Sequence, residues 1–249
     1  MRIVIISDTH GGHEALGTLE GDVLIHCGDL EGRGAAGGAA YRDIDDWFGA
    51  QRFEQIFCIG GNHDFDLEQR IRVDDQPFVN ATWLHERAIT LRGVTFYGTS
   101  WVPELRGFAF YADDHVLKAA WARIPNEVDV LVTHTPPKGV LDVSSAGHVL
   151  GCPYLARWLE QTAPRVHCFG HVHAAAGYER RGNTTFVNAS VVDSRLEVVH
   201  PPTIIDLDQP PRDSAPGSDG APGNDVKRSP ERLGRQSGKR SVIRNWLKR

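Results

Sequence analysis

The sequence predicts an α/β layered fold for residues 1–208, and two observations support this prediction. Short apolar runs, typical of buried strands, alternate with segments whose apolar residues recur at helical spacing. Polar residues gather directly after several of these apolar runs. Strands that alternate with helices and end in polar residues are typical of an α/β fold. No internal repeat of fixed period is present.

The N-terminal part of the chain combines strands with one helix. Apolar runs predict strands at residues 2–7, 22–27 and 56–59. The glycine-rich stretch 31–40 is too flexible to belong to the core, and it predicts a loop beside the end of the second strand. Residues 41–51 carry apolar side chains at helical spacing and therefore predict an amphipathic helix.

The middle of the chain continues the alternation with shorter elements. Residues 65–73 predict a helix, and residues 79–84 and 94–97 predict short strands. A further helix is predicted at 113–123. This segment opens on acidic residues, which suit a helix N-terminus, and it stops before Pro125.

The last predicted elements lie between residues 129 and 207. Residues 129–133 predict a buried strand. Residues 153–161 predict a helix, because proline near the first turn is favourable there. Strands are then predicted at 165–169, 184–187 and 203–207, and they close the ordered part of the chain.

The composition changes after Asp208, so we expect one domain at 1–208 and a disordered basic tail at 209–249. Residues 209–236 have too few apolar residues to fold. Residues 239–249 combine apolar and basic residues and predict a short basic amphipathic helix. Two interpretations of the tail remain open: it is solvated without a partner, or it makes weak, salt-sensitive contact with an anionic membrane or another polyanion.

Composition and charge limit the class of protein. The tail carries ten Lys or Arg against four Asp or Glu, a net charge of +6, and since the whole chain carries −5, residues 1–208 carry −11. This acidic body argues against specific nucleic-acid binding. No apolar run is long enough for a membrane-spanning helix, and an apolar strand begins at once, so we expect a cytoplasmic protein. The cysteines show no CxxC spacing and are interpreted as reduced thiols: Cys27, Cys58, Cys152 and Cys168.

Five clusters of polar residues follow strand-like runs. They are Asp8-Thr9-His10, Gly28-Asp29, Gly61-Asn62-His63-Asp64, Thr133-His134 and Gly170-His171-Val172-His173. Each cluster alone is more simply interpreted as a surface turn or a strand terminus. Together they supply carboxylates, an amide oxygen and imidazoles, and this donor set predicts a site for two metal ions. Mixed nitrogen and oxygen donors suit Mn²⁺, Fe or Zn²⁺ better than Ca²⁺.

Spacing within two of the clusters predicts how their side chains meet. Residues i and i+2 of an extended segment point the same way, so Asp8 is expected to converge with His10, and His171 with His173. The remaining histidines are interpreted as structural. Of these, His13 and His26 lie near enough in sequence to be candidates for supporting the ligands from behind.

In this order the clusters resemble the calcineurin-like metallophosphoesterase superfamily over residues 1–208. Further motifs resemble its MPPED-type branch, which is itself similar to class III cyclic nucleotide phosphodiesterases. They are Trp101-Val102-Pro103, Thr133-His134-Thr135-Pro136-Pro137-Lys138-Gly139, Gly151-Cys152, Asn188-Ala189-Ser190 and Pro201-Pro202. Some members of that branch have glycine in place of the first histidine of the closing pair, whereas His171 is present here. The resemblance implies a four-layered α/β/β/α sandwich.

The resemblance also implies a role for each candidate site residue. The first of two divalent metal ions (Mn²⁺, Fe²⁺/Fe³⁺ or Zn²⁺) is expected on Asp8, His10, Asp29 and His173. The second is expected on Asp29, Asn62, His134 and His171, with Asp29 bridging the two. His63 is expected to face the substrate phosphoryl group and to protonate the leaving oxygen, while Asp64 orients its imidazole.

The expected activity is metal-dependent hydrolysis of small phosphodiesters such as cyclic nucleotides, by a hydroxide that two metal ions activate. The alternatives are a phosphomonoesterase acting on phosphoproteins or metabolites, and a non-catalytic scaffold, against which the complete ligand set argues. Loops 33–38, 101–111 and 139–151 are expected to line the cleft. Four aromatic residues in the second loop are interpreted as nucleobase contacts or as loop packing: Trp101, Phe108, Phe110 and Tyr111. The sequence leaves the oligomeric state open.

Overall fold

The computed structural model describes residues 1–31, 39–71 and 76–208. The chain divides into two compact units, Met1–Gln209 and Pro210–Arg249, and all the described residues belong to the first. The predicted tail, its short helix and the loop at 33–38 lie outside the described residues.

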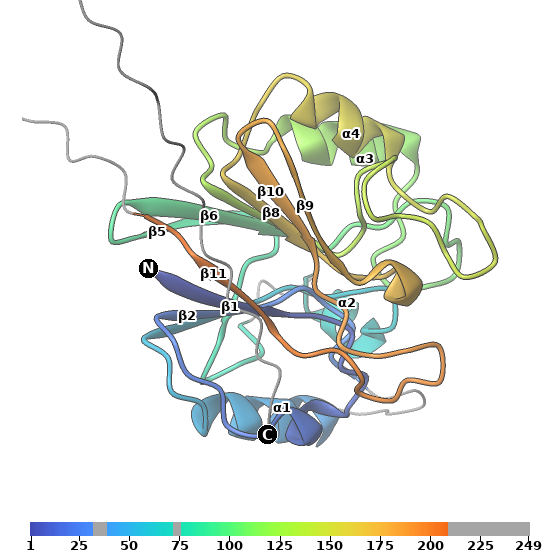
Figure 1. Cartoon of the computed structure of the whole chain (residues 1–249). Helices are drawn as coiled ribbons and strands as arrows, with labels where there is room; N and C mark the ends of the chain where they lie inside the picture. The colour runs from blue at the N-terminus through green and yellow to red at the C-terminus, as the bar shows by residue number, and fades with distance from the viewer. Residues whose placement is uncertain (32–38, 72–75, 209–249) are drawn as a thin grey trace, which may run out of the picture. The chain divides into compact units, whose positions relative to one another are not determined.

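The described residues form two β-sheets (Figure 1). The first sheet has the strand order β11-β1-β2-β3-β4, and the second has the order β5-β6-β7-β8-β10-β9. The strands are β1 Arg2–Ile6, β2 Val23–His26, β3 Gln55–Cys58, β4 Thr82–Trp83, β5 Arg87–Leu91, β6 Val94–Thr99, β7 Val130–Thr133, β8 Val166–Phe169, β9 Gly177–Arg181, β10 Thr184–Asn188 and β11 Thr203–Asp206. The helices are α1 Ala39–Gly49, α2 Phe65–Ile71, α3 Asp114–Ala122, α4 Pro153–Leu159 and two short 3-10 helices, η1 His13–Leu16 and η2 His173–Ala175.

Both sheets are parallel in their centres, and this aligns the strand ends. Strands β1 to β4 pair in parallel, as do β6, β7, β8 and β10. The antiparallel strands β11, β5 and β9 lie at sheet edges. Because the carboxyl ends of parallel strands meet at one edge of a sheet, the polar clusters that follow them are brought together.

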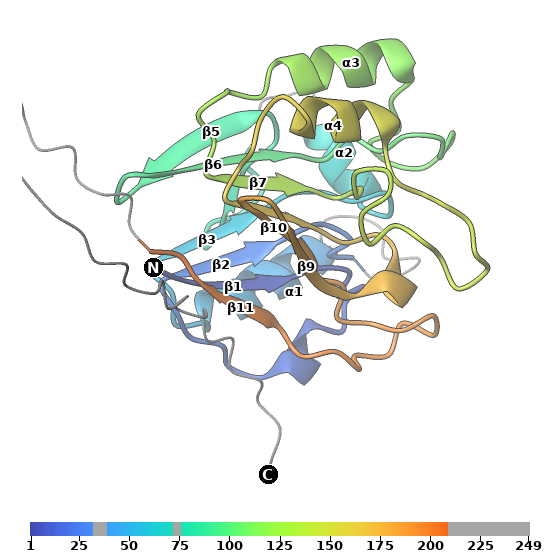
Figure 2. The same ribbon diagram turned by 45° about the horizontal axis from the view of Figure 1, so that its top comes forward.

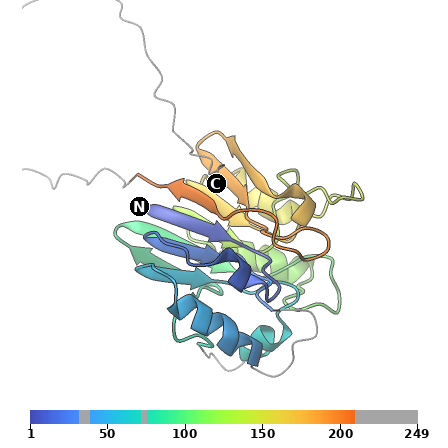
Figure 3. The same ribbon diagram turned by 60° about the horizontal axis from the view of Figure 1, so that its bottom comes forward.

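Three apolar clusters separate four layers, which confirms the predicted α/β/β/α sandwich. Alternate side chains of β1 take opposite sides: Ile3 and Ile5 pack with Phe96 and Val130 of the second sheet. On the other face, Val4 and Ile6 pack in the cluster that contains α1. A third cluster joins α3 and α4 to the second sheet. Figure 2 shows α3 and α4 over that sheet, and Figure 3 shows α1 beneath the first one.

Local sequence explains where the helices begin. The carboxylate of Asp113 accepts hydrogen bonds from the backbone N–H groups of His115 and Val116, both at 3.0 Å, and so caps α3. Pro153 occupies the first turn of α4, where a backbone donor is not needed. Among the described residues, no helix is long and apolar enough to cross a membrane.

Several element predictions need correction. Helix α1 begins at Ala39, inside the stretch predicted as a loop. The strand predicted at 79–84 is only Thr82–Trp83, and the edge strands β5 and β9 were not predicted at all. Both are exposed to half-buried along most of their length, so their sequences lack the continuous apolar run that marks the central strands.

Candidate metal centre

The candidate site lies just beyond the carboxyl ends of β1, β2, β3, β7 and β8. Its backbone is not extended there. Asp8, His10, Asp29 and His171 have φ values of 59°, 45°, 55° and 69°, in the left-handed region that non-glycine residues rarely adopt. The prediction from an extended segment was therefore wrong, because left-handed turns orient these side chains. Asp8 does converge with His10, but His173 approaches Asp8 whereas His171 approaches Asn62.

The first donor group contains Asp8, His10 and His173, each with one ligand atom within 4.8 Å of the others. His173 Nε2 lies 3.5 Å from Asp8 Oδ1. The ring of His10 lies edge-on to that of His173, with centroids 5.4 Å apart. Residues from opposite ends of the domain thus present a carboxylate and two imidazoles to one point.

The second donor group contains Asp29, Asn62, His134 and His171. His134 Nε2 lies 3.0 Å from Asn62 Oδ1 and 3.5 Å from Asp29 Oδ2. His171 Nδ1 lies 2.8 Å from the same Asn62 oxygen. The structure therefore brings together the seven residues that were predicted to bind metal. Asp8 also lies within 4.8 Å of ligand atoms of Asp29 and His134, so it approaches the second group as well as the first.

Asp29 connects the two groups through a single oxygen. Its Oδ2 lies 3.7 Å from His10 Nε2 in the first group and 3.5 Å from His134 Nε2 in the second. Its other oxygen, Oδ1, accepts a hydrogen bond from the backbone N–H of His63 at 2.8 Å. That bond holds the carboxylate so that Oδ2 faces both groups.

The tautomer of His134 shows why this arrangement suits a cation. Nδ1 lies 2.9 Å from the carbonyl oxygen of Cys27, which can only accept, so Nδ1 carries the proton of the neutral ring. Nε2 then directs a lone pair at two oxygens, Asn62 Oδ1 and Asp29 Oδ2. Three electron-rich atoms facing one another repel unless Nε2 takes a second proton or a cation lies among them. The donor set therefore fits a metal ion that replaces this proton.

His10 gives independent support for the same interpretation. It is buried, and neither of its ring nitrogens has a hydrogen-bond partner among the described residues. Buried polar atoms are rarely left unpaired in folded proteins, and each one that is calls for an explanation such as an ion.

The electrostatics of the site keep most of its ligands in the form that binds metal. Burial alone would raise the pKa of Asp29, but the imidazoles around it, His134 first, hold that pKa well below its usual value. Burial lowers the pKa of His10, and it lowers that of His171 to about 4. For His134, burial acts to lower the pKa, but Asp29, Asp8 and the Cys27 carbonyl oxygen together raise it to about 9. A metal ion therefore competes with a proton at this residue.

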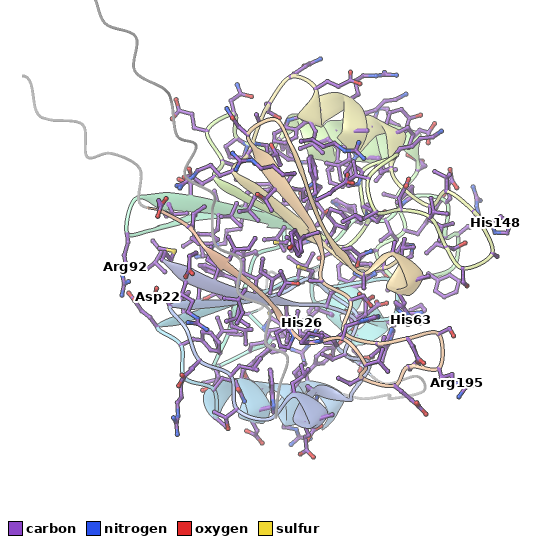
Figure 4. All side chains as sticks on the ribbon, in the orientation of Figure 1. Asp22, His26, His63, Arg92, His148 and Arg195 are labelled. Carbon is purple, nitrogen blue, oxygen red and sulfur yellow. The ribbon has the colours of Figure 1, made fainter. Side chains whose placement is uncertain are left out.

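His63 lies beside the donor groups without belonging to either. It is half-buried, and its ring is edge-on to His10 at 5.2 Å and to Phe108 at 5.5 Å. Figure 4 labels His63 beyond the ends of the strands. Its contacts with His10 and Phe108 place it between the first donor group and the loop that follows β6.

The predicted role of Asp64 needs correction, because its carboxylate faces backbone and not the His63 ring. Oδ1 accepts hydrogen bonds from the N–H groups of Leu30 and Glu31 at 3.0 and 3.1 Å. Oδ2 accepts from Asp29 at 2.9 Å and from Gly61 at 2.7 Å. Asp64 therefore holds the turn that carries Asp29, and its two oxygens are fully used there.

Two glycines leave room for the ligands. An added Cβ at Gly28, whose φ is 98°, would lie 2.7 Å from Nδ1 of His134. A side chain at Gly61 would overlap the Asp29 carboxylate. Only glycine fits these two positions, which explains why a glycine directly precedes Asp29 and another directly precedes Asn62.

Of the two histidines considered as supports, His26 touches the ligand turn. Its Nδ1 accepts a hydrogen bond from the Gly28 N–H at 3.3 Å, so Nε2 carries the proton and donates to Thr9 Oγ1 at 2.9 Å. This fully buried ring joins the end of β2 to the Asp8-Thr9-His10 turn. His13 instead pairs with Asp43 at 3.3 Å and packs against Trp47. The sequence alone could not separate the two.

Comparison with known proteins agrees with this geometry. The family model described as "Calcineurin-like phosphoesterase" matches residues 1–175. The chain is 33% identical over 235 residues to human Metallophosphoesterase domain-containing protein 1, and the match covers 84% of this chain and 72% of the relative. A UPF0046 protein of Caenorhabditis elegans is 36% identical over 205 residues, or 76% of this chain and 69% of that one. The crystal structure of TT1561 from Thermus thermophilus shares the fold, with a TM-score of 0.51 and 17% identity over 75% of this chain and 88% of the other.

Proposed function

The chain belongs to the calcineurin-like phosphoesterase family, and from this premise we propose that it is a metal-dependent phosphodiesterase for small phosphodiesters, cyclic nucleotides among them. The observation that carries the proposal is the Asp29 carboxylate oxygen, which lies 3.7 Å from His10 Nε2 and 3.5 Å from His134 Nε2. One oxygen that approaches both donor groups could be shared by a pair of divalent ions.

We assign one metal ion to each of the two donor groups, with Asp29 as a ligand of both. The first ion takes Asp8, His10, Asp29 and His173. The second takes Asp29, Asn62, His134 and His171. Their nitrogen and oxygen donors suit Mn²⁺, Fe²⁺/Fe³⁺ or Zn²⁺. When bound, such ions supply a water that ionises near neutral pH and neutralise charge on the phosphoryl oxygens.

The protein's own contribution to the chemistry comes from His63 and from the groups that hold it. The His63 backbone N–H binds Asp29 Oδ1, so its position is tied to that of the bridging carboxylate. Its ring lies 5.2 Å from the His10 ring and 5.5 Å from the Phe108 ring, and it belongs to neither donor group. In this proposal the ring donates a proton to the departing ester oxygen, which is otherwise a poor leaving group.

Metal dependence is the first test of the proposal. Titration of metal-free protein with Mn²⁺ is expected to show two equivalents bound. It should also raise the melting temperature, because each ion binds the native state only. At an ion concentration of one hundred times Kd, one site contributes about 2.7 kcal/mol, or roughly 5–11 °C for a domain of this size. Calorimetric titration and thermal unfolding measure both.

Activity on a panel of substrates completes this test. A chelator should abolish hydrolysis of an aryl phosphodiester, and Mn²⁺ should restore it, whereas Ca²⁺ should restore little because it prefers oxygen ligands. The diester, along with 2′,3′- or 3′,5′-cyclic nucleotides, should be cleaved faster than the matching monoester. Hydrolysis that survives chelation would refute the metal mechanism, and faster monoester cleavage would indicate a phosphomonoesterase.

Replacing His63 with alanine should separate its role from that of a ligand. We expect kcat to fall about 10²–10⁴-fold, the usual contribution of a general acid, while two equivalents of Mn²⁺ remain bound. The loss should shrink for substrates whose leaving group is acidic, because those need no proton. Steady-state kinetics on a series of aryl esters measures this dependence.

His115→Ala provides the matched control for His63→Ala. His115 is exposed on α3 and belongs to neither donor group, so its removal should leave kcat and metal content unchanged. Loss of one metal equivalent in His63→Ala would make His63 a ligand. An equal loss of kcat for every leaving group would rule out proton donation.

A further inference from the structure

The loop that follows β6 is fastened to the candidate metal centre. The backbone N–H of Ala109 donates to the carbonyl oxygen of Asn62 at 3.1 Å. Phe110 is fully buried, and a side chain at Gly60 would overlap its ring, so Phe110 fills the space beside the strand that carries Asn62. Val102 and Phe110 are further joined by a backbone hydrogen bond of 2.9 Å. The two residues that follow Phe108 are thus both held in place.

The aromatic residues of this loop differ in what they contact. Phe110 belongs to the core, and Trp101 packs against it while donating from Nε1 to Glu86 at 2.9 Å. Tyr111 is half-buried and lies under the guanidinium of Arg106. These contacts account for three of the four aromatic residues as loop packing, one of the two interpretations that the sequence left open.

Phe108 is the exception, because it is exposed while the residues after it are fixed. Its side chain is 41% exposed, and its ring meets the His63 ring edge-on, with centroids 5.5 Å apart and an angle of 88°. A single exposed phenyl ring is common on protein surfaces, but this one lies directly beside the residue proposed to act on the substrate.

We propose that Phe108 and His63 form an aromatic subsite that takes a planar ring on the leaving group of the substrate. The inference rests on the proposed function and adds the class of substrate: phosphodiesters whose leaving group bears an aryl ring or a nucleobase. His63 faces the departing oxygen, so the group attached to that oxygen is the part of the substrate that comes within reach of Phe108. Aromatic rings stack on such side chains without regard to their hydrogen-bonding pattern.

The test uses two phosphonates whose carbon–phosphorus bond cannot be hydrolysed. One carries a phenyl ring on phosphorus and the other carries a methyl group. Phenyl phosphonate should bind the Mn²⁺-loaded protein about tenfold more tightly than methyl phosphonate, the scale of one aromatic stack. Phe108→Ala should remove this preference and leave methyl phosphonate within about twofold of wild type. Phe108→Trp should retain it. Isothermal titration calorimetry measures all of these dissociation constants.

A second pair of ligands identifies the source of the ring. Adenosine 5′-monophosphate and ribose 5-phosphate share phosphate and sugar, so a preference for the first that Phe108→Ala abolishes would assign a nucleobase to the subsite. A Phe108-dependent preference in the phosphonate pair alone would assign an aryl ring close to phosphorus. Tyr178→Ala is the matched control, since Tyr178 is an aromatic residue 49% exposed on β9 and its loss should change no ratio.

The outcomes separate this inference from the proposed function. Wild-type protein that binds both phosphonates equally, or a Phe108→Ala variant that weakens both by the same factor, would overturn the subsite alone. A Mn²⁺-loaded wild-type protein that binds neither phosphonate and cleaves no phosphoester would overturn the subsite and the proposed function together.

Discussion

Asp29→Ala is expected to lose metal stoichiometry and activity together, with the largest catalytic effect of any single substitution in this chain. Asp29 Oδ2 is the atom that faces both donor groups, so its removal weakens both sites at once. Loss of a residue that only supports a ligand already costs about 10–100-fold, and loss of the shared ligand should exceed that. Calorimetric titration with Mn²⁺ and kcat/KM on an aryl phosphodiester measure the two effects.

Two further variants define what Asp29 contributes. Asp29→Asn keeps an oxygen for the His63 N–H, so a similar loss of metal in this variant would assign the effect to charge and not to the turn. Asp46→Ala removes an exposed carboxylate from α1 and should leave metal content and activity at the wild-type level. Two tightly bound metal ions and near-native turnover in Asp29→Ala would show that the carboxylate does not bridge.

Asp64→Asn is expected to produce the largest loss of stability. Oδ1 accepts from Leu30 and Glu31, and Oδ2 from Asp29 and Gly61, so in either orientation of the amide two buried donors lose their nearer acceptor and face an NH₂ group. In one orientation the Leu30 N–H keeps its longer bond of 3.3 Å to Oδ2. An unsatisfied buried donor costs about 1–3 kcal/mol, which suggests about 4 kcal/mol in all, or a fall in melting temperature of roughly 8–16 °C. Thermal unfolding in the presence of a chelator excludes effects of metal binding.

Asp113→Asn is the matched control for Asp64→Asn. It makes the same substitution at a carboxylate that also accepts two backbone N–H groups, but at the exposed start of α3, where asparagine caps a helix about as well as aspartate. Its melting temperature should hardly change. If Asp64 served instead to orient His63, Asp64→Asn would keep its stability and reproduce the kinetics of His63→Ala.

Much of the fold was predictable because its central strands are buried on both faces. Their apolar runs mark them individually, and the helices between them carry their own periodicity and caps. The edge strands β5 and β9 were missed, because strands with a solvent-facing side carry charged residues and resemble loops in sequence. Their assignment depends on pairing with β6 and β10.

The sequence by itself determined which residues are candidates for the site, since carboxylate, amide and imidazole groups recur directly after strands. Only the tertiary structure decided what each side chain contacts. Asp64 lies next to His63 in the chain, yet its carboxylate binds backbone groups more than thirty residues away. Phe108 and Phe110 are near neighbours of the same chemical type, yet one is core and the other lies exposed beside His63. Both distinctions arise from contacts between segments remote in sequence, and local patterns carry no record of such contacts.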